Sequence, residues 1–267
     1  MLLKDKVVLV TGSSAGIGAA IARHCVAEGA RVMIHGHDAE EVQAMKKELG
    51  DAASAYCCDF FKTGVKNVLV QKTVDAFGRI DVLINNAGIY PRNDIDDLSE
   101  DLFDRVMMVN LKVPMFLVQA AVPHFRKQGG GVVVNIGSIN AYCGQTDILV
   151  YSASKAGLMA MTRNLGDALG PDHIRVNQLN VGWTVTDNEH FLKISEGFPE
   201  GWESHIPRTY APSGRLLRPD DIAKHAVFWA SEQSAPVSGQ VYELEQYPVI
   251  GRNLINQLDV ENIKEKK

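Results

Sequence analysis

Short apolar runs alternate along the chain with longer segments whose apolar positions recur at helical spacing. The clearest runs are uninterrupted and rich in β-branched residues, and they cover positions 7–10, 31–34, 82–84, 132–136 and 175–179. Such runs are typical of strands buried on both faces. The helical segments cover 17–28, 39–49, 65–77, 102–127 and 152–169. Alternation sustained over this length predicts an α/β fold, a doubly wound parallel sheet with helices on both faces.

Two stretches depart from this alternation. Residues 182–213 are rich in Gly, Pro, His and Trp without a steady period, which is typical of a loop that covers a binding site, and this segment is named the lid. Residues 248–267 show only a short helical pattern near 254–258 and are expected to form a C-terminal extension. Because no repeat or composition break occurs elsewhere, residues 1–247 are predicted to form one domain.

The composition is that of a globular protein that folds without cross-links. Of 267 residues, 46% are hydrophobic and 22% are charged. A chain of this length and hydrophobic content can bury a large core. The formal net charge of −5 disfavours binding to nucleic acids and anionic membranes, because both favour basic patches. No apolar run approaches the ~20 residues of a membrane-spanning helix, and the N-terminus lacks a signal-peptide pattern. The cytoplasm is therefore the expected compartment.

The cysteines give no sign of a metal site or a disulfide framework. They are Cys25, Cys57, Cys58 and Cys143, and their spacing matches no zinc pattern. We expect buried or half-buried thiols in a reducing compartment, and no metal.

A glycine-rich turn follows the first predicted strand. The run Thr11-Gly12-Ser13-Ser14-Ala15-Gly16-Ile17-Gly18 leads directly into a helix. A helix N-terminus offers unpaired N–H groups and a partial positive charge, which suits an anion. Gly12 permits the tight turn, Gly16 lets a pyrophosphate approach the backbone, and Gly18 lets helix and strand pack closely. The turn, with Ser14 and Ile17, is predicted to bind a dinucleotide, although its glycines are spaced G-x3-G-x-G.

The second predicted strand ends without the acidic residue that often binds an adenosine ribose. Gly36 occupies that position, and Asp38 is expected to cap the next helix. Nothing acidic at Gly36 repels a 2′-phosphate, and His37 could contact one. The sequence therefore favours NADP slightly over NAD.

Tyr151 and Lys155 are four residues apart in a predicted helix and project from the same face. A tyrosine titrates near ~10, and a cation close by is expected to lower its pKa toward neutrality. Ser138 follows the strand at 132–136, and its hydroxyl is placed to bind a substrate oxygen. These three residues predict a proton-transfer site.

Taken together, these motifs resemble the short-chain dehydrogenase/reductase family, over about residues 4–245. The features that carry the resemblance are the glycine turn at 11–18, Asp59, Asn85-Asn86-Ala87-Gly88, Asn110, Ser138, and the Tyr151-x-x-x-Lys155 motif. The resemblance implies a Rossmann-like, single-domain sheet of about seven strands. It implies that Asp59 bonds the adenine amino group and that Asn86, Ala87 and Gly88 line the adenosine side. It also implies that Asn110 anchors a water in a proton relay from Tyr151 through Lys155.

The chain departs from the family pattern in two places. Asn180-Val181-Gly182 stands where Pro-Gly is usual, so contact of Gly182 and Thr184 with the nicotinamide carboxamide is a weaker expectation. The usual Asp-Gly-Gly near the C-terminus is absent from 239–247. The long helices at 102–127 and 152–169 resemble those of intersubunit bundles in the family, which implies a homotetramer.

The predicted reaction interconverts a secondary alcohol and a ketone by hydride transfer, with Tyr151 as acid and base. One alternative is a non-catalytic, redox-sensing NAD(P)-binding regulator, and another is a dehydratase or epimerase on the same fold. The mixture of polar and aromatic side chains expected around the substrate suggests a sugar or polyol. Those side chains are Ser138, Asn140, Gln145, Tyr151, Trp183 and His190, with Trp202 and His205 nearby.

Overall fold

The computed structural model describes residues 1–62, 65–142, 145–250 and 252. Cys143 and the helix predicted near 254–258 lie outside the described residues. The C-terminal extension therefore stays a prediction.

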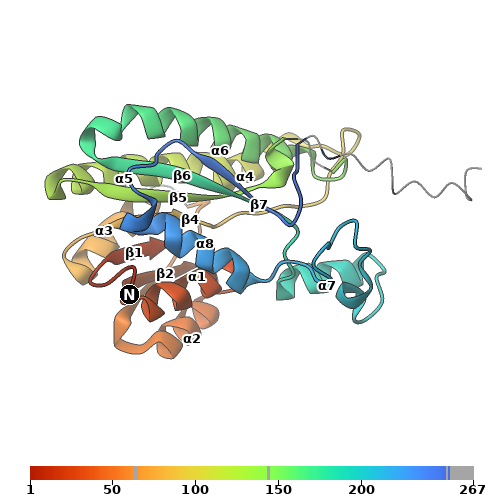
Figure 1. The fold of residues 1–267 in the computed structure, drawn as a ribbon, viewed down its shortest axis with the longest axis horizontal. Helices are drawn as coiled ribbons and strands as arrows, with labels where there is room; N and C mark the ends of the chain where they lie inside the picture. Colours follow the sequence, from red (N-terminus) through yellow and green to blue (C-terminus); the bar gives the residue numbers. More distant parts are fainter. Residues whose placement is uncertain (63–64, 143–144, 251, 253–267) are drawn as a thin grey trace, which may run out of the picture.

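One parallel sheet forms the centre of the molecule (Figure 1). Its strand order is β3-β2-β1-β4-β5-β6-β7, so the order reverses beside β1. The strands are β1 (Val7–Val10), β2 (Arg31–Gly36), β3 (Ala53–Cys57), β4 (Val82–Asn85), β5 (Gly131–Ser138), β6 (Ile174–Val181) and β7 (Val241–Leu244). The predicted doubly wound, Rossmann-like fold with about seven strands is confirmed.

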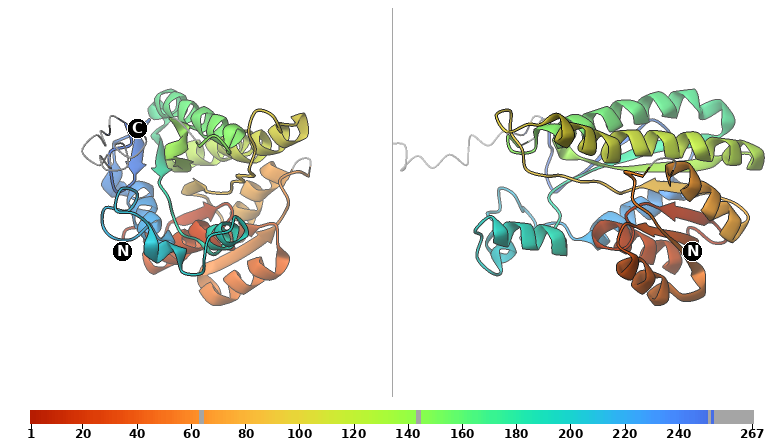
Figure 2. Two further views of the ribbon diagram at one scale, coloured as in Figure 1. Left: turned by 90° about the vertical axis from the view of Figure 1, so that its right-hand side faces the viewer. Right: turned by 180° about the vertical axis from the view of Figure 1, so that it is seen from behind.

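Helices cover both faces of this sheet (Figure 2). Helices α1, α2 and α8 pack on one face, and α3, α5 and α6 pack on the other. Their bounds, with those of the two remaining helices, are α1 (Gly16–Ala27), α2 (Ala39–Leu49), α3 (Val65–Phe77), α4 (Glu100–Met107), α5 (Val113–Gln128), α6 (Leu149–Ala168), α7 (Asp187–Ser195) and α8 (Pro219–Ala230).

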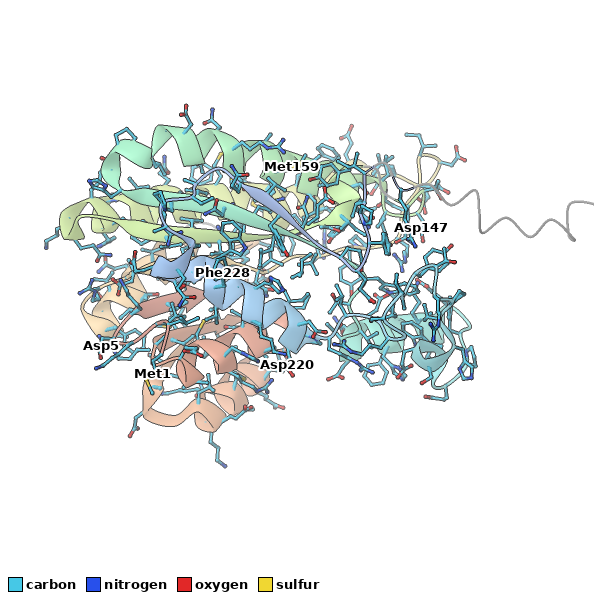
Figure 3. The ribbon with its side chains drawn as sticks, viewed as in Figure 1. Met1, Asp5, Asp147, Met159, Asp220 and Phe228 are labelled. Carbon is cyan, nitrogen blue, oxygen red and sulfur yellow. The ribbon has the colours of Figure 1, made fainter. Side chains whose placement is uncertain are left out.

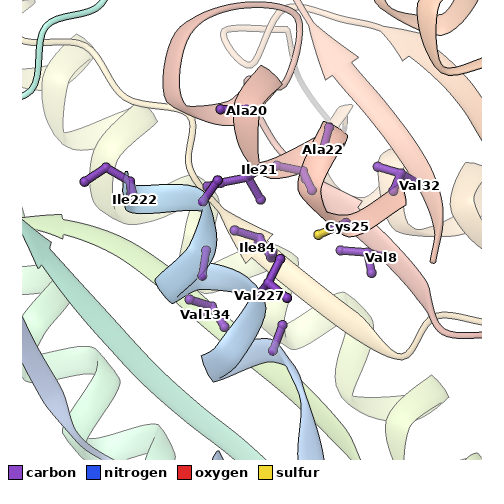
Figure 4. Close-up of a cluster of buried hydrophobic side chains, with 14 of the residues drawn as sticks. Val8, Ala20, Ile21, Ala22, Cys25, Val32, Ile84, Val134, Ile222 and Val227 are labelled. Carbon is purple, nitrogen blue, oxygen red and sulfur yellow. The ribbon is translucent and has the colours of Figure 1, made fainter. Parts of the chain in front are cut away.

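The strands are apolar on both faces, as the uninterrupted runs predict. Val8 and Val10 of β1 pack with Ile21 and Cys25 of α1 (Figure 4), while Leu9 between them packs in the opposite cluster with Leu117 of α5. Burying both faces of a central strand fixes its register, because a shift by one residue would exchange the two sets. This double core holds the carboxyl ends of the strands at one edge.

The structure differs from the predicted elements in three ways. Strands β3 and β7 were not among the apolar runs, because Ala53–Cys57 and Val241–Leu244 are short and mix polar with apolar residues at the two sheet edges. The helix predicted over 102–127 is interrupted by a π-helical turn, Met108–Lys112, between α4 and α5. The lid is not wholly irregular, because it contains α7, for which Thr186 is the N-cap.

The run Glu100–Gln128 is long and apolar enough to span a membrane by length and hydropathy alone, with a window mean of 1.5. The sequence analysis expected no such run. Several of its apolar side chains, Val113, Leu117, Ala121 and Phe125, are buried against the sheet. This packing is that of a core helix in a globular domain.

Candidate active site

The candidate site lies at the carboxyl ends of the strands, next to the reversal of strand order. Ligands of open α/β sheets bind in the crevice at this position. The glycine turn follows β1, the segment 86–88 follows β4, Ser138 ends β5, and the lid follows β6. The lid extends beyond this end of the sheet (Figure 1).

The glycine turn has a geometry that only glycine allows at its key positions. Gly12 and Gly16 have φ angles of 62° and 54°, which side chains disfavour. A Cβ on Gly18 would collide with the Gly12 carbonyl oxygen and would lie 2.5 Å from Asn86 Nδ2. Ala15, the N-cap of α1, makes no side-chain hydrogen bond to the first turn of that helix. The open helix N-terminus therefore fits a pyrophosphate.

The segment after β4 is tied to this turn. Asn86 Nδ2 donates to the carbonyl oxygens of Thr11 and Gly12, at 3.0 and 2.9 Å. Thr11 Oγ1 accepts hydrogen bonds from the backbone N–H groups of Asn86 and Ala87. Gly88 lies beside Lys155, since a Cβ on it would be 3.5 Å from the lysine Nζ. The structure thus brings together Gly12, Asn86, Ala87 and Gly88, as expected.

His35 is a further support of the turn that the sequence did not reveal. Its Nδ1 accepts a hydrogen bond from the Gly12 N–H at 3.1 Å, and its Nε2 lies 3.2 Å from the Cys58 carbonyl oxygen. This pair of partners requires the neutral tautomer with the proton on Nε2. Burial lowers the pKa of His35 to about 4, so the neutral form persists at physiological pH.

At the end of β2, space excludes any side chain on Gly36. A Cβ there would lie 2.6 Å from Ser14 Oγ and 2.8 Å from a Val42 methyl. Asp38 caps α2, as predicted, by accepting from the Glu40 and Glu41 N–H groups. The Glu41 carboxylate, which the sequence analysis did not single out, accepts a hydrogen bond from Ser14 Oγ at 3.0 Å. An acidic group therefore reaches the glycine turn from α2.

Two other predicted cofactor residues, His37 and Asp59, lie near this end of the site. The side chain of His37 is exposed, and its carbonyl oxygen accepts a weak hydrogen bond from Cys57 Sγ. Asp59 is half-buried, and its Oδ1 accepts from the Phe61 N–H within its own turn.

Ser138, Tyr151 and Lys155 converge from β5 and α6. The Lys155 Nζ donates to the Ile136 carbonyl oxygen at 2.8 Å and lies 5.6 Å from the centre of the Tyr151 ring. Burial lowers the pKa of Lys155 to about 8. An ammonium has three N–H donors, and the described residues supply one acceptor, which leaves this amine able to bind a ribose hydroxyl.

The pKa of Tyr151 differs from the expectation. The sequence predicted that Lys155 would lower it, but burial raises the pKa of Tyr151 above its ordinary value. A hydrogen bond with Ser138 opposes this rise, and the negative charge of Glu189 adds to it. Desolvation of the phenolate by burial is the largest cause of the rise.

Asn110 sits in the π-helical turn and is fully buried. Its Oδ1 accepts from the Ile89 N–H, and its Nδ2 donates to the Ile89 carbonyl oxygen and to Ser154 Oγ. The wider turn of a π-helix aims this amide at the segment after β4 and at α6 together, a feature often found at functional sites. The water expected on Asn110 stays a prediction.

The side chains predicted to bind substrate occupy different parts of the site. The Asn140 N–H donates to Ser138 Oγ at 3.1 Å, which places Asn140 next to that serine, whereas Gln145 is exposed. Trp183 Nε1 donates to Glu189 Oε1 at 2.9 Å. The recorded contacts of His190 lie within the lid, where it approaches Glu200 and Glu203 and stacks near Trp202.

The lid is a small unit with its own apolar centre. Trp202 is 2% exposed and stacks on Trp183 with ring centres 5.6 Å apart. Val185, Ala211 and Leu216 complete this cluster. Trp202 and His205 were both expected near the substrate. Trp202 instead lies in the interior of the lid, and His205 Nδ1 lies 3.2 Å from the Gly201 carbonyl oxygen, four residues before it.

Two lid threonines differ in their positions. Thr184 is buried, and its hydroxyl donates to the Gly182 carbonyl oxygen. Thr186, which the sequence analysis did not select, lies against the glycine turn, since a Cβ on Gly16 would be 3.5 Å from its methyl group. Gly182 itself packs on Glu245, whose carboxylate also accepts from the Trp183 N–H.

Tyr90 is another residue that only the fold reveals. Its ring meets the Tyr151 ring edge-on, with the centres 6.0 Å apart. Burial is the main reason that the pKa of Tyr90 rises to about 12. The residue follows Asn86–Gly88 along the chain without any pattern that marks it.

Comparisons with known proteins agree with this geometry. The model of the short chain dehydrogenase family matches residues 6–196. The chain is 38% identical to L-rhamnose 1-dehydrogenase (NAD(P)(+)) of Azotobacter vinelandii, over 90% of this chain and 94% of that protein. It is 34% identical to galactitol 2-dehydrogenase of Agrobacterium fabrum, over 92% and 98% of the two chains.

Among solved structures, a 3-ketoacyl-(acyl-carrier-protein) reductase from Brucella melitensis, complexed with NADH, is similar to this chain. Its TM-score is 0.84 at 30% identity, and the match covers 93% of this chain and 100% of the other. The protein is an NAD(P)-dependent oxidoreductase that acts on CH–OH groups, and it belongs to the short-chain dehydrogenase/reductase family.

Proposed function

We propose that the protein interconverts a secondary alcohol and a carbonyl in a sugar or polyol, with Tyr151 as the acid and base. The observation that carries this proposal is the convergence of Ser138, Tyr151 and Lys155 at the carboxyl ends of the strands, the end from which the lid extends. The two similar dehydrogenases, which are named for rhamnose and galactitol, support the substrate class. D-xylose 1-dehydrogenase of Caulobacter vibrioides, 34% identical over 91% of this chain and 95% of that protein, adds a third sugar.

In the proposed oxidation, the C–H bond breaks with its electron pair, and the hydroxyl proton moves to the Tyr151 phenolate. A nicotinamide held at this site would supply the hydride acceptor. Ser138 donates a hydrogen bond to the substrate oxygen, and Lys155 stabilises the phenolate by its charge. In the reverse direction, Tyr151 returns its proton to the new alkoxide.

The residues present fit a dinucleotide cofactor. The turn Gly12–Gly18 and the open N-terminus of α1 would hold the pyrophosphate, and Asn86–Gly88 would line the adenosine side. Lys155 has N–H donors for the nicotinamide ribose, and Thr186 lies where the lid meets the turn. Asp59 Oδ2 is available for the adenine amino group.

The structure changes which cofactor we propose. The slight preference for NADP rested on the missing acid at Gly36. Glu41 supplies a carboxylate within 3.0 Å of Ser14 Oγ at the same corner. A carboxylate accepts from a ribose hydroxyl and repels a 2′-phosphate, so we favour NAD over NADP.

The test of the proposed function is a spectrophotometric scan at the reduced-nicotinamide band. L-rhamnose, D-xylose, galactitol and an acetoacetyl thioester would be offered with NAD and NADP in the appropriate redox state. The proposal expects turnover of at least one sugar or polyol. Turnover of the thioester alone would replace it with acyl reduction, and cofactor binding without any turnover would favour a redox-sensing regulator.

The assembly and compartment remain proposals. A homotetramer is supported by apolar side chains left exposed on α4, α5 and α6, among them Phe103, Met115 and Leu149. Sedimentation velocity at several protein concentrations tests it. A cytoplasmic location rests on the sequence alone.

A further inference from the structure

Helix α7 of the lid, which carries the acidic residue Glu189, lines a cavity together with Gly88 and Tyr90. Glu189, in the first turns of α7, is half-buried, and its N–H donates to Thr186 Oγ1. Its Oε1 accepts the Trp183 Nε1–H at 2.9 Å. This bond orients the carboxylate, and among the described residues no hydrogen bond to Oε2 is found, so this oxygen can accept one.

The cations nearest to Glu189 are paired with a different acid. Lys193 Nζ contacts Glu196 at 2.6 Å, and Arg92 Nε contacts Glu196 at 2.7 Å. Arg92 also approaches Asp147, which lies at the lid end of the molecule (Figure 3). Within the described part of the chain, no Lys, Arg or His lies within ion-pair distance of Glu189. Its charge is therefore less fully compensated than that of Glu196.

Tyr90 and Tyr151 are the groups that Glu189 influences across the pocket. Tyr90 lines the same cavity as α7, and the negative charge of Glu189 contributes to the raised pKa of both phenols. The two rings meet edge-on at 6.0 Å. Burial raises the pKa of Glu189 itself, and Lys193 and Arg92 oppose that rise.

We propose that Glu189 is a specificity residue, whose free carboxylate oxygen accepts a hydrogen bond from a substrate hydroxyl adjacent to the one being oxidised. This inference rests on the proposed function and narrows it to substrates with vicinal hydroxyl groups. A site that hydrogen-bonds a substrate hydroxyl discriminates against an analogue that lacks this hydroxyl, because the polar group of the protein is then left without a partner.

A purely structural role for Glu189 would be to hold Trp183. Glutamine keeps a carbonyl oxygen that accepts the indole N–H, but it loses the negative charge. Glu189→Gln therefore separates the two roles. Asp187→Asn is the matched control, because Asp187 is an exposed acid in the first turn of the same helix.

The experiment compares kcat/KM for the best vicinal polyol of the wild type with kcat/KM for its analogue lacking the neighbouring hydroxyl. Glu189→Gln should lower the polyol value about 10- to 100-fold, the scale of one charged hydrogen bond, and change the analogue value less than about threefold. Asp187→Asn should leave both values near those of the wild type. Equal losses on both substrates, or no loss on either, would overturn the proposal.

A pH profile supplies a second readout that a structural role would not move. The charged and titratable groups around Tyr151 are Glu189, Lys155 and Tyr90, with Ser138 as a hydrogen-bond partner. Because Glu189 raises the pKa of Tyr151, Glu189→Gln should lower it. Oxidation needs the phenolate, so the rise of kcat with pH should shift to lower pH. An unchanged profile would contradict the inference.

Failure of the inference and failure of the proposed function give different results. A wild type that oxidises no sugar or polyol contradicts the proposed function, and the inference with it. A wild type that oxidises vicinal polyols and their deoxygenated analogues equally well contradicts only the role of Glu189.

Discussion

At the carboxyl ends of the strands, backbone groups hold Lys155 and Asn110, whereas in the lid the side chains of Trp183, Glu189 and Trp202 hold one another. Lys155 donates to the Ile136 carbonyl, and Asn110 bonds both backbone groups of Ile89. In the lid, Trp183 bonds Glu189 and stacks on Trp202.

Under the proposed function, this difference would let one region carry the chemistry and the other set the substrate. Backbone partners are present whenever the strands and helices form, so they do not depend on the identity of neighbouring side chains. Side-chain partners change with each substitution. A lid built on them can acquire a new specificity while the catalytic end stays intact.

The largest effect is expected from Tyr151→Phe. The change removes the proton donor and acceptor but keeps the ring, so kcat should fall by about 100-fold or more. Cofactor affinity, measured by fluorescence titration with reduced nicotinamide, should stay near that of the wild type. A variant with unchanged turnover would show that another group moves the proton.

Gly18→Ala tests the close packing between the glycine turn and the segment after β4. The new methyl would meet the Gly12 carbonyl and Asn86 Nδ2, and overpacking of this kind costs about 1–3 kcal/mol. We expect cofactor affinity to weaken about 10-fold or more. Gly170→Ala is the control, because nothing lies within 4 Å of the added methyl. Equal affinities in the two variants would contradict the packing assigned to Gly18.

His35 predicts how this region responds to acid. Its pKa is about 4 in the folded protein and 6.5 without the fold, so the unfolded chain binds the proton more readily. Its stabilising contribution is present above pH 6.5 and is lost as the pH falls toward 4, with roughly 2 kcal/mol gone by about pH 5. Urea unfolding at several pH values measures this loss. His35→Asn should flatten the dependence, and an unchanged slope would disprove the assigned tautomer.

Glu41→Gln gives the smallest expected effect. Removing an exposed charge beside Ser14 should raise the kcat/KM ratio of NADP to NAD by about 10-fold or less. Glu40→Gln, on the same helix turn, is the control, because no contact links the Glu40 side chain to the glycine turn. A ratio that does not change would remove Glu41 from cofactor selection.

Sequence reasoning was sufficient where a motif is local. Tyr151 and Lys155 share a face because they are four residues apart, and the glycine turn joins a strand to a helix within eight positions. Both depend on spacing along one element. The apolar runs likewise predicted the central strands, because burial on both faces leaves few polar positions.

The rest of the site needed the fold. Glu41 bonds Ser14 from another element, and the charge of Glu189, which contributes to the pKa of Tyr151, comes from α7, another element again. The π-helical turn around Asn110 could not be predicted, because the apolar positions of the sequence keep a helical spacing through it. Edge strands β3 and β7 escaped detection because residues such as Ser54 and Glu243 interrupt their apolar pattern.

The central claim is that a hydride leaves the carbon of a polyol hydroxyl while Tyr151 takes the hydroxyl proton. The most direct measurement uses the polyol substrate deuterated at that carbon, with mass spectrometry of the nicotinamide product. One deuterium should appear on the nicotinamide with the wild type, and about 100-fold more slowly with Tyr151→Phe. Deuterium that remains on the substrate or passes to water would contradict the account.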